Sequence, residues 1–456
     1  MCHKKLLQDK RIISSIYYLK YTVSVNSYPL VSSQPKGIKV NNDRINPFYK
    51  FSTIKLFFYS QFPIHKSNSF CEMGDYGQYI IPTVDEQVNF KVGQPAPSLL
   101  PLDKIRLAAA AKFEETDPLF LQYGHIYGFP KFRASLSKFL TERYQVDVDP
   151  EKILATNGNT GALALLCSLF SKSGDVVYAE EPTYFLAKSI FNDYNLNCQQ
   201  IPMDEDGLDV VALEEKLKIG PIPVFMYVVT TAHNPTGRTL TAERRAKLAS
   251  LSAEYGFYLL CDEVYQLLTF PHVQAPPPMF TYDTHGKILA MGSFSKILAP
   301  ALRVGWIQGA PELLKKIADC GQLDSSGGLN PVSFGLVQKA IDMGLQDEHL
   351  DSVRQILWTR CETLMNALDK HLPEGTTYEK PQGGYFILVK LPQGQLATEL
   401  LAEATANHKI GFLPGASFGD NMKNFFRLSF SYYDACDLEI GAQRLGDAIR
   451  AYQSKK

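Results

Sequence analysis

Short apolar runs alternate with amphipathic helical patterns between residues 150 and 310. The runs contain few polar positions, which is typical of strands buried on both faces of a parallel sheet. The segments between them place apolar residues at helical spacing, as Leu163, Leu166 and Phe170 do. Strands separated by helices predict an α/β fold with a mainly parallel sheet sandwiched by helices. The expected strands are KILAT (152–156), DVVYA (175–179), VFMYVV (224–229), FYLLC (257–261) and KILAM (287–291), and the expected helices are 159–170, 183–191 and 241–255.

The pattern changes after residue 330. Two long helical patterns, 331–345 and 353–372, are followed by the strand-like runs GGYFILVKL (383–391) and FFRLSFSY (425–432). This order predicts a smaller α+β domain. The expected regions are 1–72, a basic N-terminal extension; 73–110, a segment that joins the small domain; 111–325, the large domain; and 326–456, the small C-terminal domain.

The first 72 residues differ in composition from the rest. They hold eleven Lys and Arg against three acidic residues, with many Ser, Tyr and Phe. This composition partly resembles an organellar transit peptide, although no Arg-rich amphipathic helix is visible. We favour a disordered extension, or a stretch absent from the mature protein with Met73 as its start. The expected location is then cytoplasmic, with a mitochondrial location as the alternative if 1–72 is a transit peptide.

Bulk properties exclude several classes of function. The formal net charge of −1 gives no reason to expect nucleic acid as a partner. No apolar stretch is long enough to span a membrane. The eight cysteines are scattered, without CxxC spacing or a Cys/His cluster. We interpret them as reduced thiols and expect no metal site.

Polar residues follow the predicted strands, at the edge of a parallel sheet where ligands bind. After 152–156 comes NGNTGALA, a helix start that can hold an anion, although Asn159 or Thr160 could simply cap the helix. After 224–229 comes HNPTG, in which Asn234 could belong to an ordinary turn. After 257–261 come Asp262 and Tyr265.

The run KILAM is followed by the segment SFSKILAPALRVGW (293–306), which contains Lys296 and Arg303. A lysine at the end of a buried strand either extends to water or has a chemical use. Pyridoxal 5′-phosphate would use all of these strand ends. It needs an amine for a Schiff base, a carboxylate at its ring nitrogen, neutral donors at its ring oxygen, and helix N–H groups with a cation at its phosphate.

The motifs HNPTG, CDEVY and SFSKILAPALRVGW, in this order and spacing, resemble the class I/II aminotransferases, the fold-type-I pyridoxal-phosphate enzymes. The resemblance runs from about Asn89 to Ser431 and is strongest to the branch with kynurenine/2-aminoadipate and other aromatic aminotransferases. It implies that residues 111–325 form the cofactor-binding domain, that the substrates are an L-amino acid and a 2-oxo acid, and that the protein is a homodimer.

The resemblance also implies a role for each matching residue. Lys296 is the Schiff-base lysine and proton shuttle, and Asp262 is the partner of the ring nitrogen. Asn159 and Thr160 stand where the family usually has Ser-Gln, so we expect them to act through backbone N–H groups more than through side chains. The remaining matches are Asn234 and Tyr265 at the ring oxygen, Ser293 and Arg303 at the phosphate, Tyr184 stacked over the ring, Tyr123 at the phosphate of the partner subunit, and Gly93, Asn234 and Arg427 at the substrate.

Two other functions stay open on the same residues. A β-lyase acting on C–S bonds or a cyclopropane-forming synthase would share nearly every cofactor contact. A non-catalytic cofactor domain that serves a transcription regulator as its effector sensor is more remote, because 1–72 shows no helix-turn-helix pattern.

Overall fold

The computed structural model describes residues 81–455. The predictions made for residues 1–72 lie outside the described residues. No helix within 81–455 is long and apolar enough to cross a membrane. Its helices are α3 (Leu102–Phe113), α4 (Pro130–Tyr144), α5 (Gly158–Phe170), α6 (Phe185–Asp193), α7 (Val210–Ile219), α8 (Ala242–Tyr255), α9 (Pro311–Ala318), α10 (Gly321–Ser326), α11 (Pro331–Asp342), α12 (Leu345–His371), α13 (Ala397–Asn407) and α14 (Ala435–Gln453).

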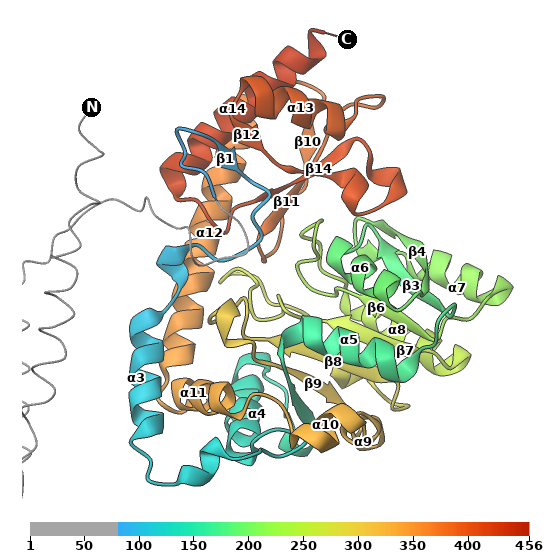
Figure 1. The fold of residues 1–456 in the computed structure, drawn as a ribbon. Coiled ribbons are helices and arrows are strands. Elements are labelled where there is room, and N and C mark those ends of the chain that lie inside the picture. The colour runs from blue at the N-terminus through green and yellow to red at the C-terminus, as the bar shows by residue number, and fades with distance from the viewer. Residues whose placement is uncertain (1–80, 456) are drawn as a thin grey trace, which may run out of the picture. The chain divides into compact units, whose positions relative to one another are not determined.

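The larger of the two main sheets has eight strands and helices on both sides (Figure 1). Its order is β2-β9-β8-β7-β6-β3-β4-β5, and the neighbours from β8 to β4 are all parallel. The strands β9 and β5 run antiparallel to their neighbours. The strands are β2 (Ile153–Thr156), β3 (Val176–Glu181), β4 (Asn197–Asp204), β5 (Gly207–Leu208), β6 (Phe225–Val228), β7 (Tyr258–Asp262), β8 (Ile288–Ser293) and β9 (Gly305–Gly309).

Helices cover both faces of this sheet, as β6 illustrates. Phe225 and Tyr227 pack in a core shared with α5 and α6, whereas Met226 and Val228 pack in a second core shared with α7 and α8. Side chains alternate between the two faces of a strand, so a strand covered on both sides must be apolar at successive positions. The predicted fold class, a mainly parallel sheet between helices, is confirmed.

A second, antiparallel sheet has the order β10-β11-β14-β13. The start of the described chain contacts its C-terminal part, because β1 pairs in parallel with β12 in a separate two-stranded sheet. The bounds are β1 (Val88–Asn89), β10 (Thr377–Tyr378), β11 (Phe386–Lys390), β12 (Ile410–Gly411), β13 (Leu413–Pro414) and β14 (Phe425–Ser429).

The helix α11 lies beyond the predicted boundary at residue 325, yet it packs against α4, which belongs to the predicted domain 111–325. Phe334 of α11 stacks on Phe132 of α4, with ring centroids 5.0 Å apart. The predicted division into 73–110, 111–325 and 326–456 stays a prediction.

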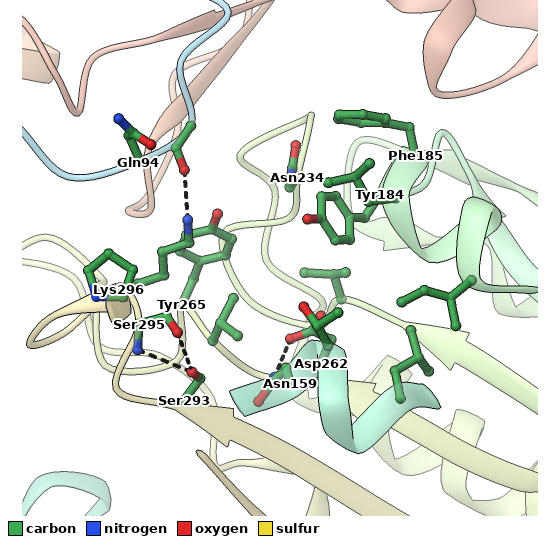
Figure 2. Close-up of a pocket in the computed structure, with 18 of the residues that line it drawn as sticks. Gln94, Asn159, Tyr184, Phe185, Asn234, Asp262, Tyr265, Ser293, Ser295 and Lys296 are labelled. Carbon is green, nitrogen blue, oxygen red and sulfur yellow. Dashed lines mark hydrogen bonds between the residues drawn. The ribbon is translucent and has the colours of Figure 1, made fainter. Parts of the chain in front are cut away.

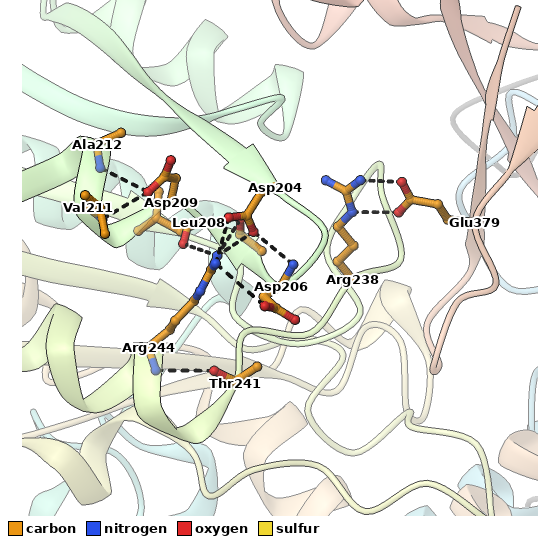
Figure 3. A network of polar contacts seen from close by, with 11 residues as sticks. Asp204, Asp206, Leu208, Asp209, Val211, Ala212, Arg238, Thr241, Arg244 and Glu379 are labelled. Atoms are coloured by element: carbon orange, nitrogen blue, oxygen red, sulfur yellow. Dashed lines mark hydrogen bonds and ion pairs between the residues drawn. The ribbon is translucent and has the colours of Figure 1, made fainter.

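Polar contacts fix the loops around the larger sheet (Figure 3). Arg244 of α8 holds the carboxylate of Asp204 with two hydrogen bonds, of 2.6 and 2.7 Å. Asp209 accepts hydrogen bonds from the first N–H groups of α7 and so caps that helix. Arg238 and Glu379 form a two-pronged ion pair. This last pair joins the loop after β6 to the residue that follows β10.

Candidate active site

A cavity of about 470 Å³ lies at the carboxyl ends of the central strands. The strands β4 and β5 lie on one side of β3, and the chain then crosses to β6 on its other side. Such a reversal of the strand order leaves a crevice where ligands bind in open α/β sheets. Every predicted site residue except Tyr123 lines this cavity. The predicted residues that line it are Gly93, Asn159, Thr160, Tyr184, Asn234, Asp262, Tyr265, Ser293, Lys296, Arg303 and Arg427.

Lys296 follows the end of β8 and points into the cavity (Figure 2). Its Nζ donates a hydrogen bond of 2.6 Å to the carbonyl oxygen of Gly93 and lies 5.3 Å from the centroid of the Tyr385 ring. Burial, followed by the charge of Arg427, lowers the pKa of Lys296 to about 8. About a tenth of the amine is therefore uncharged, and so nucleophilic, at pH 7, far more than of an ordinary lysine.

Asp262 is the last residue of β7 and is buried. Asn159 Nδ2 donates a 2.7 Å hydrogen bond to Oδ1, and the hydroxyl of Tyr227 donates a 2.8 Å hydrogen bond to Oδ2 (Figure 2 shows the first). Burial raises the pKa of Asp262, and these donors oppose that shift. The Asn159 side chain is thus engaged, where we expected its backbone to matter more.

The N-terminus of α5 forms one end of the cavity together with Arg303 and two serines. Arg303 Nη2 donates to the carbonyl oxygen of Asn157 at 3.2 Å, and its Nη1 donates to the hydroxyl of Ser295, also at 3.2 Å. Ser293 in turn donates to Ser295 at 3.0 Å. A helix N-terminus, two hydroxyl groups and a guanidinium make a site for an anion with several oxygen atoms.

Gly158, the first residue of α5, is required by this arrangement. Its φ is +71°, and a Cβ there would lie 2.7 Å from Arg303 Nη2. A larger residue would both strain the backbone and displace the guanidinium.

Arg427 of β14 lies at another side of the cavity. Its Nη1 donates a 2.8 Å hydrogen bond to Asn234 Oδ1, and its Nη2 donates one of the same length to the carbonyl oxygen of Lys91. Its Cζ lies 3.9 Å from the centroid of the Phe386 ring. Because the oxygen of Asn234 faces Arg427, the amide nitrogen remains to donate to a ligand. At Gly93 an added Cβ would lie 3.0 Å from Phe386 Cζ, so a side chain would crowd this corner.

Of the three tyrosines predicted for the site, two line the cavity and one lies elsewhere. Burial raises the pKa of Tyr265 well above its usual value, so its phenol keeps its proton and can donate a hydrogen bond. Tyr184 lies directly before α6, beside Phe185, with ring centroids 5.7 Å apart (Figure 2). Tyr123 follows η2 (Pro118–Leu121), is 79% exposed and does not line the cavity of its own chain.

Sequence reasoning missed Tyr227 and Ser295. Tyr227 carries the one hydroxyl in the apolar run VFMYVV, and a polar group inside a buried strand is the signal that could have revealed it. Ser295 stands between Phe294 and Lys296 in the motif SFSKILAPALRVGW, and only the fold shows that its hydroxyl accepts a hydrogen bond from Arg303.

This set of groups fits pyridoxal 5′-phosphate. The anion site suits its phosphate, the buried carboxylate of Asp262 suits its ring nitrogen, and the amine of Lys296 suits its aldehyde. Asn234 and Tyr265 offer neutral donors for its ring oxygen. The fold and cavity therefore define a pyridoxal-phosphate enzyme of fold type I.

Comparison with known proteins agrees. Residues 85–445 match the family of class I and II aminotransferases, and the chain belongs to that family. It is 31% identical to an aromatic-amino-acid aminotransferase of Thermococcus litoralis, over 80% of this chain and 88% of the other. It is also 31% identical to a 2-aminoadipate transaminase of Thermus thermophilus, over 80% and 90%.

Among solved structures, a kynurenine aminotransferase of Pyrococcus horikoshii in complex with PMP superposes with a TM-score of 0.75. It is 32% identical, over 81% of this chain and 92% of that one. Other relatives are named as HTH-type transcriptional regulators. The protein is a pyridoxal-phosphate-dependent transaminase that acts on amino and 2-oxo acids.

We predict that Lys296 is the residue that binds the cofactor covalently. Borohydride reduction of the purified holoprotein should leave the pyridoxyl group on the peptide that contains Lys296, as mass spectrometry can show. Because only the uncharged amine reacts, cofactor uptake by the cofactor-free protein should accelerate as pH rises through about 8 and then level off. Labelling of another lysine, or uptake that slows over this range, would contradict the assignment.

Proposed function

We propose that the protein transfers the amino group of an aromatic or 2-aminoadipate-like L-amino acid to a 2-oxo acid. The observation that carries this proposal is the placement of Lys296 and Arg427 in one cavity, with the charge of Arg427 acting on Lys296. An amine and a carboxylate clamp within one site are what a substrate with an α-amino and an α-carboxylate group requires. Its two relatives named above act on substrates of these two kinds.

The groups of this chain divide the work. Arg427, with Asn234 and the corner at Gly93, holds the substrate α-carboxylate and so fixes Cα. The bound cofactor supplies an aldehyde for the amino group and a protonated ring that accepts the electron pair of the broken Cα–H bond. Lys296 Nζ accepts the proton from Cα and later returns a proton, a task suited to an amine whose pKa lies near the working pH.

An apolar wall along α6 favours a large apolar side chain on the substrate. Phe185, Leu186 and Ile190 line the cavity and are only half-buried, so part of each surface stays available to a ligand. Phe185 also packs edge-on against Phe418, with centroids 5.6 Å apart. The Cζ of Arg427 lies over the Phe418 ring, 5.4 Å from its centroid. An aromatic side chain beside the carboxylate clamp would cover this surface.

We predict that a panel of L-amino acids with 2-oxoglutarate or pyruvate as acceptor gives the highest kcat/KM for aromatic donors. Phe185→Ala should lower kcat/KM for phenylalanine by ~10-fold, since a buried aromatic contact is worth about 1–2 kcal/mol, and should affect alanine much less. Equal losses for both donors would show that this apolar wall does not contact the side chain of the substrate. Steady release of ammonia and pyruvate from a β-substituted donor would indicate a lyase, and cofactor binding without turnover of any donor would indicate a sensor.

The apolar surface of α3 and η2 supports a homodimer. Six large side chains are exposed along this stretch, and a gathering of exposed apolar side chains is typical of a protein–protein interface. A second copy related by a two-fold axis would cover it with the same patch. The exposed side chains are Leu102, Leu107, Phe113, Leu119, Leu121 and Tyr123.

In this dimer Tyr123 completes the partner's site. It ends the apolar patch, is 79% exposed and lies outside its own cavity. The phosphate end of the cavity has an open side, because Arg303 is exposed. A phenol from the second copy would close that side and donate one more hydrogen bond to the anion.

We predict that two inactive variants restore each other's activity. Tyr123→Ala and Lys296→Ala, mixed and allowed to exchange subunits, should regain up to about one quarter of wild-type activity, because one site of a mixed dimer is intact. Val211→Ala, which alters an exposed residue on α7 remote from the patch, serves as the control and should retain activity. A fully active monomer in sedimentation, or no recovery from near-inactive parents, would contradict the shared site.

A further inference from the structure

The carboxylate of Asp262 receives a side-chain hydrogen bond on each oxygen, in addition to one from the backbone N–H of Val264. Asn159 approaches Oδ1 from the start of α5, at 2.7 Å, and Tyr227 approaches Oδ2 from β6, at 2.8 Å. Tyr227 is fully buried and its side chain lines the cavity. No role for Tyr227 follows from the roles proposed above, because the ring oxygen and the phosphate have other donors.

The Tyr227 hydroxyl is the donor, and the carboxylate of Asp262 the acceptor, in the hydrogen bond between them. Burial, followed by the charge of Asp262, raises the pKa of the phenol well above its usual value, so the phenol keeps its proton and donates. A donor at each oxygen stabilises the anion against the burial that favours its protonated form. Two side-chain bonds from different elements also fix the plane of the carboxylate. A carboxylate has about four acceptor positions, so with the N–H of Val264 also bound there is room for one further donor.

We propose that Tyr227 is a positioning residue that acts through Asp262. It keeps the carboxylate ionised and oriented toward the cationic ring nitrogen of the cofactor, with Asn159 as the second support. The proposal rests on the proposed function of the site, in which Asp262 faces that nitrogen. A hydrogen bond to a charged group corresponds to a ~10- to ~150-fold effect on an equilibrium or rate, so its loss is measurable.

Tyr178 provides a matched control. It lies on β3 of the same sheet, is also fully buried, and donates its hydroxyl to the carbonyl oxygen of Pro221 at 2.7 Å. Its ring belongs to the core on the opposite face, with α7 and α8. Tyr178→Phe therefore removes the same hydroxyl from an equally buried position that does not touch the cavity.

The test compares Tyr227→Phe, Tyr178→Phe, Asp262→Asn and the double variant Tyr227→Phe/Asp262→Asn as holoproteins. The measurements are the thermal midpoint of unfolding, kcat and KM, and the pH midpoint of the visible absorption of the bound cofactor. With less support for the anion, the proton shared with the ring nitrogen moves toward Asp262. The cofactor ring, with less positive charge, would withdraw electron density less strongly. The nitrogen joined to Lys296 would then be more basic, and the absorption midpoint would move to higher pH.

Tyr227→Phe should shift this midpoint upward and lower kcat by ~10-fold or more with a smaller change in KM. Tyr178→Phe should leave both unchanged. In the Asp262→Asn background the Tyr227 substitution should change kcat by no more than ~2-fold, because residues that act as a unit are not additive.

A midpoint and kcat equal to those of Tyr178→Phe, or full additivity with Asp262→Asn, would overturn the proposal. If Tyr227→Phe does not fold, Asn159→Ala removes the other donor while keeping its backbone N–H group, and an unchanged midpoint in that variant overturns it equally. The absorption midpoint needs no turnover, so the proposal can fail or hold independently of the proposed transamination.

Discussion

The buried carboxylate of Asp262 is the one negative charge among the described residues that line the cavity, and the rest of the site is arranged around it. Lys296, Arg303 and Arg427 bring positive charge into the same space. Such an excess is unfavourable in a partly buried site unless anions bind, and it lowers the pKa of Lys296, after the effect of burial. A phosphate and a substrate carboxylate would restore the balance. The site is thus electrostatically suited to a doubly anionic cofactor and an anionic substrate.

The parallel sheet makes this arrangement possible. Tyr227 pairs with Leu260 on β7, and Asp262 pairs with Met291 on β8, so the ends of three neighbouring strands meet at one edge. Below them, Arg245 is fully buried and binds the loop after β6 at the carbonyl oxygen of Thr230, 2.9 Å away. Its guanidinium also donates to the carbonyl oxygens of Leu240 and Pro277, so removing it would cost several hydrogen bonds. Tyr227 and Asp262 thus lie on strands of the sheet, whereas Asn234 and Lys296 lie in the turns that follow β6 and β8.

Much of this follows from the sequence. Each predicted strand was found within three residues of its expected bounds, because a strand covered on both faces must be a continuous apolar run. Lys296, Asp262 and Asn234 were selected because polar residues directly after such runs share one edge. What the sequence did not reveal depends on contacts between distant segments. The strand GWIQG lacks a strong pattern, and it forms β9 because it pairs with β2 and β8.

The side-chain direction of Asn159 is a second example. Helix capping and binding of Asp262 are both open to an asparagine at a helix start, and only the position of β7 decides between them. The bond from Tyr227 to Asp262 joins residues 35 positions apart and has no local signature. Periodicity therefore places elements, whereas the partners of a polar side chain follow from the packing of elements far apart in the chain.

A transaminase site moves an amino group from donor to acceptor without releasing it as ammonia. The direct measurement is a half-reaction, in which holoprotein is mixed with an excess of an aromatic L-amino acid and no 2-oxo acid. We predict that one equivalent of the corresponding 2-oxo acid per subunit appears, that no ammonia is formed, and that the reaction stops until a 2-oxo acid is added. Continued release of ammonia with the 2-oxo acid, or no 2-oxo acid from any donor, would contradict it.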